Sequence, residues 1–229
     1  MDRRRENDSR ESRDEMMSEL GQAYAAALLS GDEIEAETAI REAMDASLTT
    51  AEIDDEIIAP ALWLVGELWE RGEITVADEH LATEISMRVV TLQREAQRVV
   101  LSRGDHGVIL AAPAGELHVV ALRMIANLLR DAGYDVLMLG ADVPADALAT
   151  SARRHEADVI CISATMQGGD EQVTITMNAV QRAWPRAGFV IGGGAVASRV
   201  RSRPGVDVCG RVSEVVEAVD AMVQRADQN

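Results

Sequence analysis

The sequence predicts an N-terminal bundle of four helices followed by a doubly wound α/β domain with a five-stranded parallel sheet. Two observations predict this order. Between residues 14 and 103, apolar residues recur every three or four positions, which is the period of an amphipathic helix. After Gly104, five short apolar runs alternate with helical stretches, which is the pattern of βαβ units. We therefore expect two domains, 14–103 and 104–229, preceded by a disordered charged tail over residues 1–13.

The first half is predicted to form four helices with short connections, which is the plan of a helical bundle. The first helix presents an apolar face that includes Tyr24 and Leu28. Gly31 ends this helix. The side chain of Asp32 then caps a second helix that runs to about Leu48.

The third and fourth predicted helices follow a similar logic. Thr50 caps the third helix, and Glu52 lies in its acidic first turn, where negative charge suits the helix dipole. Pro60 starts or kinks this helix locally, because proline has no N–H to donate. Gly72 ends it, and a fourth long helix covers about 76–101.

The second half is predicted to form an α/β sheet that is covered on both faces. The predicted strands are residues 108–112, 136–139, 159–162, 189–191 and 206–209. The predicted helices between and after them are residues 118–131, 145–155, 171–184 and 213–225. We expect the flavodoxin-like strand order of a Rossmann-like domain, in which ligands bind beyond the carboxyl ends of the strands. The loops that bear on function are then residues 113–118, 140–144, 163–169 and 192–198.

Composition narrows the class of protein. Hydrophobic residues make up 47% of the chain but aromatic residues only 3%, so aliphatic side chains must build the cores. The net charge of −17 argues against direct binding to nucleic acid or to anionic membranes. No apolar run approaches the roughly 20 residues of a membrane span, and we expect a cytoplasmic protein. Cys161 and Cys209 lie in apolar strand-like segments and are predicted to be buried, reduced thiols.

The loop after the first predicted strand carries a candidate metal ligand. Pro113 and Gly115 allow a sharp exit from the strand, so that His118 projects from the top of the sheet. A neutral imidazole is a good ligand for a transition metal. Glu116, two residues away, can accept the other ring N–H and fix the tautomer. The alternative is an ordinary surface histidine at the start of a helix.

Two later loops have a composition that suits a bulky ligand. Ser163 and Thr165 place hydroxyl groups at the end of the third strand. Gly192 and Gly193 end the fourth strand, where the lack of a side chain lets a ligand approach the backbone. No G-x-G-x-x-G pattern follows the first strand, so this is not a dinucleotide-type phosphate loop.

These motifs together resemble a known family. Residues 107–229 resemble the cobalamin-binding Rossmann-like domain shared by corrinoid methyltransferases, mutases and cobalamin photoreceptors. The family pattern is Asp-x-His-x-x-Gly, then Ser-x-Leu, then Gly-Gly. Here it reads Glu116-x-His118-x-x-Ala121, Ser163-x-Thr165 and Gly192-Gly193. The departures are Glu for Asp, Ala for Gly and Thr for Leu, and the first of them is similar to photoreceptor members.

The resemblance implies a role for each matched position. His118 would displace the dimethylbenzimidazole of the cofactor and ligate cobalt from below. Ser163 would contact the displaced nucleotide tail, and Gly192 and Gly193 would leave room for it. The segment 139–144 matches the end of the family's second strand. The other residues implied to contact the cofactor are Gly115, Glu116, Asp142, Val143 and Thr165.

The helical half resembles the same family. A four-helix bundle beside this domain is similar to the cap over the upper face of the corrin ring. Trp69, followed after nine residues by Glu79 and His80, matches the W-x9-EH signature of cobalamin-dependent photoreceptors. There the Trp packs on the upper axial ligand and the Glu-His pair lines the same cavity. The alternatives are bundle core for Trp69 and a solvated helix face for Glu79 and His80.

The resemblance implies a binding or sensor protein rather than an enzyme. Light would break the Co–C bond of a bound cobalamin, with adenosylcobalamin favoured and methylcobalamin or hydroxocobalamin as other forms. Loss of the upper ligand would change a homo-oligomer or an interface with a protein partner. Only about 13 residues precede the bundle, so we expect a partner such as a transcription regulator to bind DNA. Glu70 stands where some members have a second cobalt-binding His.

Two other functions fit the same plan. A corrinoid methyl carrier would shuttle a methyl group between methyltransferases, with His118 as the lower ligand. A cobalamin storage or delivery protein would bind the cofactor without a switch. The sequence leaves the upper ligand, the oligomeric state and the partner open.

Overall fold

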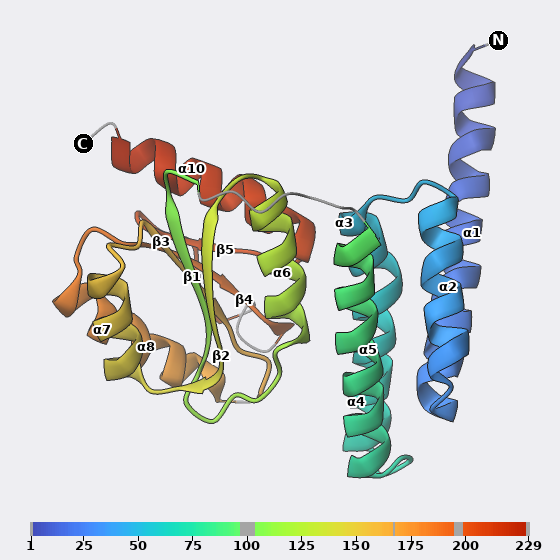
Figure 1. Ribbon diagram of the computed structural model, residues 1–229, viewed down its shortest axis with the longest axis horizontal. Coiled ribbons are helices and arrows are strands. Elements are labelled where there is room, and N and C mark those ends of the chain that lie inside the picture. The colour runs from blue at the N-terminus through green and yellow to red at the C-terminus, as the bar shows by residue number, and fades with distance from the viewer. Residues whose placement is uncertain (1, 97–103, 167, 195–198, 228–229) are drawn as a thin grey trace. The chain divides into compact units, whose positions relative to one another are not determined.

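The computed structural model describes residues 2–96, 104–166, 168–194 and 199–227. The chain consists of two compact units, Met1–Arg98 and Val99–Asn229 (Figure 1). The predicted domain boundary lies between residues 103 and 104, and residues 97–103 are outside the described residues. The domain limits therefore stay a prediction. Within the described residues, no helix combines the length and the apolar character needed to cross a membrane.

The first unit is helical, as predicted. It contains α1 (Asp2–Ser30), α2 (Glu33–Asp45), a third helical run of α3 (Thr50–Ile53), η1 (Asp54–Ile58) and α4 (Ala59–Glu70), and α5 (Val76–Ala96). Small and aliphatic side chains fill its core, and Tyr24 is fully buried among them. The Tyr24 hydroxyl donates to Ser86 Oγ at 2.9 Å, which satisfies a polar group that burial would otherwise penalise.

Helix α1 covers the segment 1–13 that was predicted to be a disordered tail, apart from residue 1, which is not described. No glycine or proline interrupts the chain before Gly21, so nothing in the backbone chemistry ends the helix earlier. Arg13 also forms a bidentate ion pair with Glu52, with both distances 2.8 Å. High charge predicted disorder, but a continuous helix anchored to the bundle is compatible with the same charge.

Helix caps follow the predicted chemistry with one correction. Asp32 caps α2 and accepts hydrogen bonds from the N–H groups of Ile34 and Glu35, both at 3.1 Å. The cap of the third helical run is Thr49, not Thr50. Thr49 Oγ1 accepts from the Glu52 N–H at 3.2 Å, and Glu52 Oε2 accepts from the Thr49 N–H at 2.7 Å. A reciprocal capping box requires a Glu or Gln three residues after the cap. Glu52 comes three residues after Thr49 but only two after Thr50, so Thr49 is the cap.

Five residues of the third helical run form a π-helix, η1, immediately before Pro60. Proline has no N–H, so the hydrogen bond that would reach back to the carbonyl of Glu56 does not form. The N–H of Ala59 instead donates to the carbonyl of Asp54, five residues earlier. Pro60 therefore restarts the helix, as predicted, and Asp54 at the start of η1 is fully buried.

The second unit is the predicted α/β domain with a parallel sheet in the order β2-β1-β3-β4-β5 (Figure 1). The strands are β1 (Gly107–Pro113), β2 (Asp135–Val143), β3 (Val159–Ser163), β4 (Gly188–Gly192) and β5 (Val206–Val208). The helices are α6 (Val120–Asp131), α7 (Ala145–Arg154), α8 (Gly169–Ala183), η2 (Val212–Glu214) and α10 (Val215–Asp227). Helix α6 packs with α10, and α7 packs with α8, so two helical layers enclose the sheet.

Two local differences affect the site. His118 precedes α6 instead of beginning it, so the loop after β1 is longer than predicted. Most of the predicted loop 140–144 belongs to β2, because register shifts let the strand continue to Val143. Asp142 consequently adopts a positive φ of 51°, which is uncommon for a residue other than glycine.

The prediction for the two cysteines is confirmed. Cys161 and Cys209 are both buried, and neither forms a disulfide. Burial raises the pKa of both thiols, and that of Cys209 reaches about 11. Both therefore remain neutral thiols near pH 7.

Candidate functional site

The candidate site lies where the strand order of the sheet reverses. Strands β1 and β3 are neighbours, but the chain leaves β1 for α6 and leaves β3 for α8, which belong to opposite helical layers. In open α/β sheets ligands bind at such a switch point, beyond the carboxyl ends of the strands. Glu116 from the first loop and Thr165 from the second meet there.

Glu116 is the centre of this site. It is only 3% exposed, yet every partner it needs is present. Its Oε1 accepts from the His118 backbone N–H at 3.0 Å and lies 2.5 Å from His118 Nδ1. Its Oε2 accepts from the N–H groups of Thr165 and Met166, at 2.6 and 3.0 Å, and from the Thr165 hydroxyl at 3.0 Å. The carboxylate thus joins the two loops.

These hydrogen bonds determine the charge of Glu116. Burial acts to raise the pKa of the carboxyl group, because a charged group loses its hydration. The His118 side chain and the backbone N–H groups of His118, Met166 and Thr165 stabilise the charged form and outweigh burial. They lower the pKa of Glu116 to about 2, so it is a carboxylate throughout the physiological range.

His118 is oriented by this carboxylate. Its Nδ1 faces Glu116 Oε1 at 2.5 Å and the Thr165 hydroxyl at 3.0 Å. Because an anionic carboxylate accepts hydrogen bonds, the proton of a neutral imidazole belongs on Nδ1, and the lone pair then lies on Nε2. The side chain is 46% exposed, so the imidazole that Glu116 orients lies at the surface of the unit.

Gly115 and Asp142 fix the loop that carries Glu116. The Glu116 N–H donates to the carbonyl of Pro113 at 3.0 Å, which closes a tight turn. Gly115 has a φ of +84° within this turn, a conformation that favours glycine. Its N–H donates to Asp142 Oδ1 at 2.8 Å, and the Asp142 N–H donates to the Glu116 carbonyl at 2.9 Å. Val143, beside it on β2, pairs with Pro113.

Ser163, Gly192 and Gly193 lie together at the ends of β3 and β4. Ser163 is paired with Gly192, and the Ala164 N–H donates to the Gly192 carbonyl at 3.0 Å. A Cβ on Gly193 would lie 2.1 Å from the carbonyl oxygen of Ala164, and its φ is +106°. Gly193 is therefore required by the packing of these two strand ends, whatever ligand is bound. A Cβ on Gly192 would make only an ordinary 3.6 Å contact.

The helical unit contains the other three predicted residues. Trp69 is the penultimate residue of α4 and is 37% exposed. Glu79 lies in the first turn of α5, where its Oε2 is 2.5 Å from His80 Nδ1 and its Oε1 accepts from the Thr83 hydroxyl at 3.1 Å. The His80 side chain is 72% exposed. The unit thus carries a second imidazole oriented by a carboxylate.

Sequence reasoning missed one main-chain contributor to the site and one buried carboxyl group of the helical unit. The backbone N–H of Met166 binds Glu116, and no side-chain pattern signals a main-chain donor. Asp54 of η1 is fully buried, which the acidic run around it concealed. The burial of Asp54 and the π-helix that contains it became visible only in the structure.

Family models agree with this geometry. Two models described as B12 binding domain match residues 107–220 and 20–92. The chain belongs to the B12-binding protein family. Among its relatives, the HTH-type transcriptional repressor CarH of Myxococcus xanthus is 36% identical over 153 residues, which cover 66% of this chain and 50% of CarH. Trimethylamine corrinoid protein 2 of Methanosarcina acetivorans is 25% identical over 204 residues, covering 84% of this chain and 91% of the relative.

A solved structure has the same fold. The monomethylamine corrinoid protein of Methanosarcina barkeri superposes with a TM-score of 0.72 at 18% identity, covering 90% of this chain and 98% of that one. The sequence match to CarH spans only about half of that protein's length. The names of these relatives differ: two are corrinoid proteins and one is a transcriptional repressor.

Proposed function

We propose that this chain binds cobalamin through His118 and acts as a light-responsive regulatory protein. The observation that carries the first part is the oriented imidazole, with Nδ1 held by Glu116 and the side chain exposed. The second part rests on Trp69, Glu79 and His80, which have the spacing of the photoreceptor signature, and on the likeness to a transcriptional repressor. The cytoplasmic location stays a prediction.

The residues of the site fit an axial cobalt ligand. A carboxylate behind the imidazole raises its basicity and holds the ring in one orientation. Thr165 binds both Glu116 and His118, so we assign it a positioning role rather than a contact with the cofactor. Gly115 has open space beside its Cα, where a Cβ would meet nothing within 4 Å. We propose that Gly115, Ser163 and Gly192 leave room for the cofactor.

Bound cobalamin would supply a Co–C bond that visible light can cleave. The protein's own residues would hold the cofactor, exclude water and respond when the upper ligand is lost. We propose that Trp69 and Glu79 select adenosylcobalamin over forms with a smaller upper ligand. The response would then change a homo-oligomer or the surface for a protein partner such as a transcription regulator, because a ligand shifts an equilibrium only through differential contacts.

A second function has its own support. The fold of the monomethylamine corrinoid protein matches over 98% of that protein's length. The sequence match to trimethylamine corrinoid protein 2 covers 91% of that relative. A methyl-carrier role would use the same His118 and Glu116 but would not require Trp69. Storage or delivery of cobalamin would need neither light nor a methyltransferase.

The test is an absorption spectrum of the full chain. Protein mixed in the dark with adenosylcobalamin or methylcobalamin is desalted, and spectra and elution volumes are recorded before and after green light. We expect bound cobalamin, a light-dependent spectrum and a change in size. His118→Ala should weaken binding at least about tenfold, whereas His106→Ala, at the opposite end of β1, should not.

Two matched variants separate the candidate functions. Trp69→Ala should lose the preference for adenosylcobalamin, whereas Trp63→Ala, on the same helix and 63% exposed, should keep it. Equal behaviour of the two variants would overturn the sensor proposal. Bound cobalamin that is indifferent to light but is methylated by a methyltransferase would establish the carrier function. Absence of binding would overturn both.

A further inference from the structure

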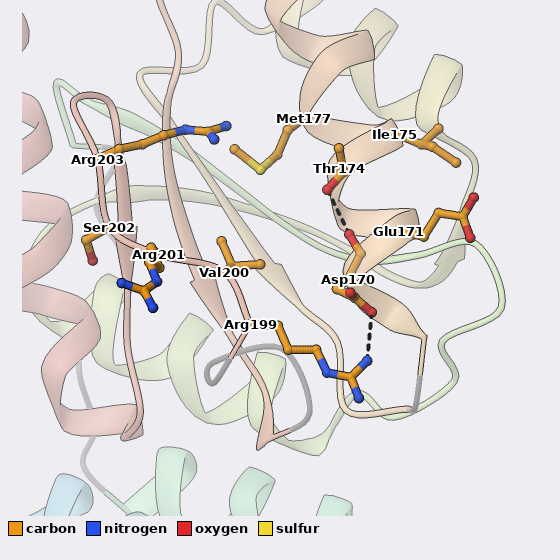
Figure 2. Close-up of a pocket in the computed structure, with 10 residues that line it drawn as sticks. All are labelled: Asp170, Glu171, Thr174, Ile175, Met177, Arg199, Val200, Arg201, Ser202 and Arg203. Atoms are coloured by element: carbon orange, nitrogen blue, oxygen red, sulfur yellow. Dashed lines mark hydrogen bonds and ion pairs between the residues drawn. The ribbon is translucent and has the colours of Figure 1, made fainter.

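A cavity lies in the α/β unit, lined by residues other than those predicted to bind the cofactor. It has a volume of about 720 Å³ and opens between the first half of α8 and residues 199–203 (Figure 2). None of the residues assigned above to cobalamin lines it. Small-molecule pockets typically have volumes of about 300–1,000 Å³, so the size suits a small organic ligand.

The wall formed by residues 199–203 is held in place by hydrogen bonds to β5. The N–H of Arg203 donates to the Val206 carbonyl and the N–H of Val206 donates to the Arg203 carbonyl, both at 2.8 Å. Ser202 Oγ accepts from the Val208 N–H at 3.2 Å. These bonds hold Ser202 and Arg203 against β5.

The cavity combines an apolar floor with a cationic rim. Met177 of α8 supplies apolar surface on the side of the arginines, and Val200, which packs against the core of the unit, lies near it, whereas the Ile175 side chain points to the other side of α8 in Figure 2. Arg199, Arg201 and Arg203 line the opposite side. In Figure 2 the side chain of Arg203 extends toward Met177, which brings charge and apolar surface together.

The three arginines differ in their partners. Arg199 is paired with Asp170 at 3.3 Å. In the described part of the chain, neither Arg201 nor Arg203 forms an ion pair through its guanidinium group. The other acidic residue of the lining, Glu171, turns its carboxylate away from them in Figure 2. Two cationic groups beside an apolar floor therefore lack an anion, in a chain whose net charge is −17.

We propose that this cavity binds a small organic anion that carries an apolar body. Its carboxylate or phosphate would pair with Arg201 and Arg203, because guanidinium groups bind such planar or tetrahedral anions through paired hydrogen bonds. Its apolar part would lie on Met177 and Val200. The site is independent of the proposed cobalamin function, since it uses none of the same residues.

The probe is 8-anilinonaphthalene-1-sulfonate, which has an aromatic body and one anionic group. The full chain is labelled with ¹³C in its methionine methyl groups, and the Met177 signal is assigned with Met177→Leu. We expect saturable shifts of this signal. The double variant Arg201→Gln, Arg203→Gln should weaken the effect at least about tenfold, whereas Arg186→Gln, elsewhere in the same unit, should leave it unchanged.

A second pair of variants guards against misfolding of the first. Thr174 is exposed and lines the cavity, so both Thr174→Glu and Thr174→Gln should fold. The glutamate should repel the probe, and the glutamine should weaken it much less. Displacement of the probe by phenyl phosphate or by benzoate supports the proposal and identifies the anionic group. A Met177 signal that does not shift, or that shifts equally with the uncharged N-phenyl-1-naphthylamine, would overturn it.

Discussion

Two buried carboxyl groups, one in each unit, differ completely in their chemistry. Glu116 of the α/β unit is 3% exposed and Asp54 of the helical unit is 0% exposed, so both have lost nearly all contact with water. Glu116 accepts five hydrogen bonds, four of them at 3.0 Å or less from backbone or hydroxyl donors. Neither oxygen of Asp54 has a hydrogen-bond partner within the residues that the structure describes.

The pKa values move in opposite directions. The pKa of Glu116 falls to about 2. Burial raises the pKa of Asp54 to about 7, and the neighbouring charge of Asp55 adds to the rise. Gln93 counteracts it only weakly, because its amide does not reach hydrogen-bonding geometry with the carboxylate. The comparison teaches that donors, not burial, decide whether an interior carboxyl group keeps its charge.

The largest effect should come from removing the charge of Glu116. Glu116→Gln places an amide N–H₂ against the N–H groups of Thr165 and Met166, or leaves those donors unpaired. We expect the α/β unit to lose about 3 kcal/mol of unfolding free energy. Hydrogen exchange of β1 and β3 amides in increasing urea measures this loss. Glu79→Gln is the matched control, because Glu79 pairs with an exposed imidazole and should lose less than about 1 kcal/mol. Equal losses of unfolding free energy in Glu116→Gln and Glu79→Gln would contradict the expected difference between these two carboxylates.

Asp54→Asn should have the opposite sign. The folded unit prefers neutral Asp54, so its stability is fully present below the ordinary pKa of 3.8 and decreases as the pH rises to about 7. At pH 8 we expect the variant to be more stable than the natural chain by about 2 kcal/mol, with the difference vanishing toward pH 4. Exchange of α5 amides at several pH values measures it. For Glu116 the sign reverses, since its contribution is present above pH 4.5 and is lost as the pH falls toward 2.

A difference that does not depend on pH would mean that Asp54 does not change its protonation between the folded and unfolded states. Asp55→Asn provides the control, because it removes the neighbouring charge without entering the core. It should lower the pKa of Asp54 and shift the transition toward lower pH.

The smallest effect should come from the hydroxyl groups that support the two Glu–His pairs. Thr165→Val keeps the backbone donor to Glu116 but removes the hydroxyl donor to the same oxygen. We expect a loss of about 1 kcal/mol in the α/β unit. Thr83→Val removes the hydroxyl that donates to Glu79 and should lose about 0.3 kcal/mol in the helical unit. Urea unfolding of both variants would establish the order, and a larger loss for Thr83→Val would reverse it.

Local chemistry explains why so much of the fold was predictable. The five apolar runs could only be strands of a doubly covered sheet, and their alternation with helices determined a parallel order. Asp32 begins α2 and Gly72 follows the end of α4 through contacts within a few residues. The pair Glu116 and His118 was predicted for the same reason, since a carboxylate two residues from an imidazole can reach Nδ1 without help from the rest of the chain.

Tertiary structure decided what depends on distant segments. The adjacency of β1 and β3 brings Thr165 to Glu116, 49 residues away in sequence, which the loop pattern did not predict, whereas its contact with the cofactor stays a prediction. Asp54 lies at the start of a π-helix and is fully buried in the packed bundle, although its neighbours in sequence are acidic. Sequence by itself determined which groups can ionise and which can donate. Only the packed chain decided which donors reach which carboxylate, because hydrogen bonds form over about 3 Å and the sequence does not contain that distance.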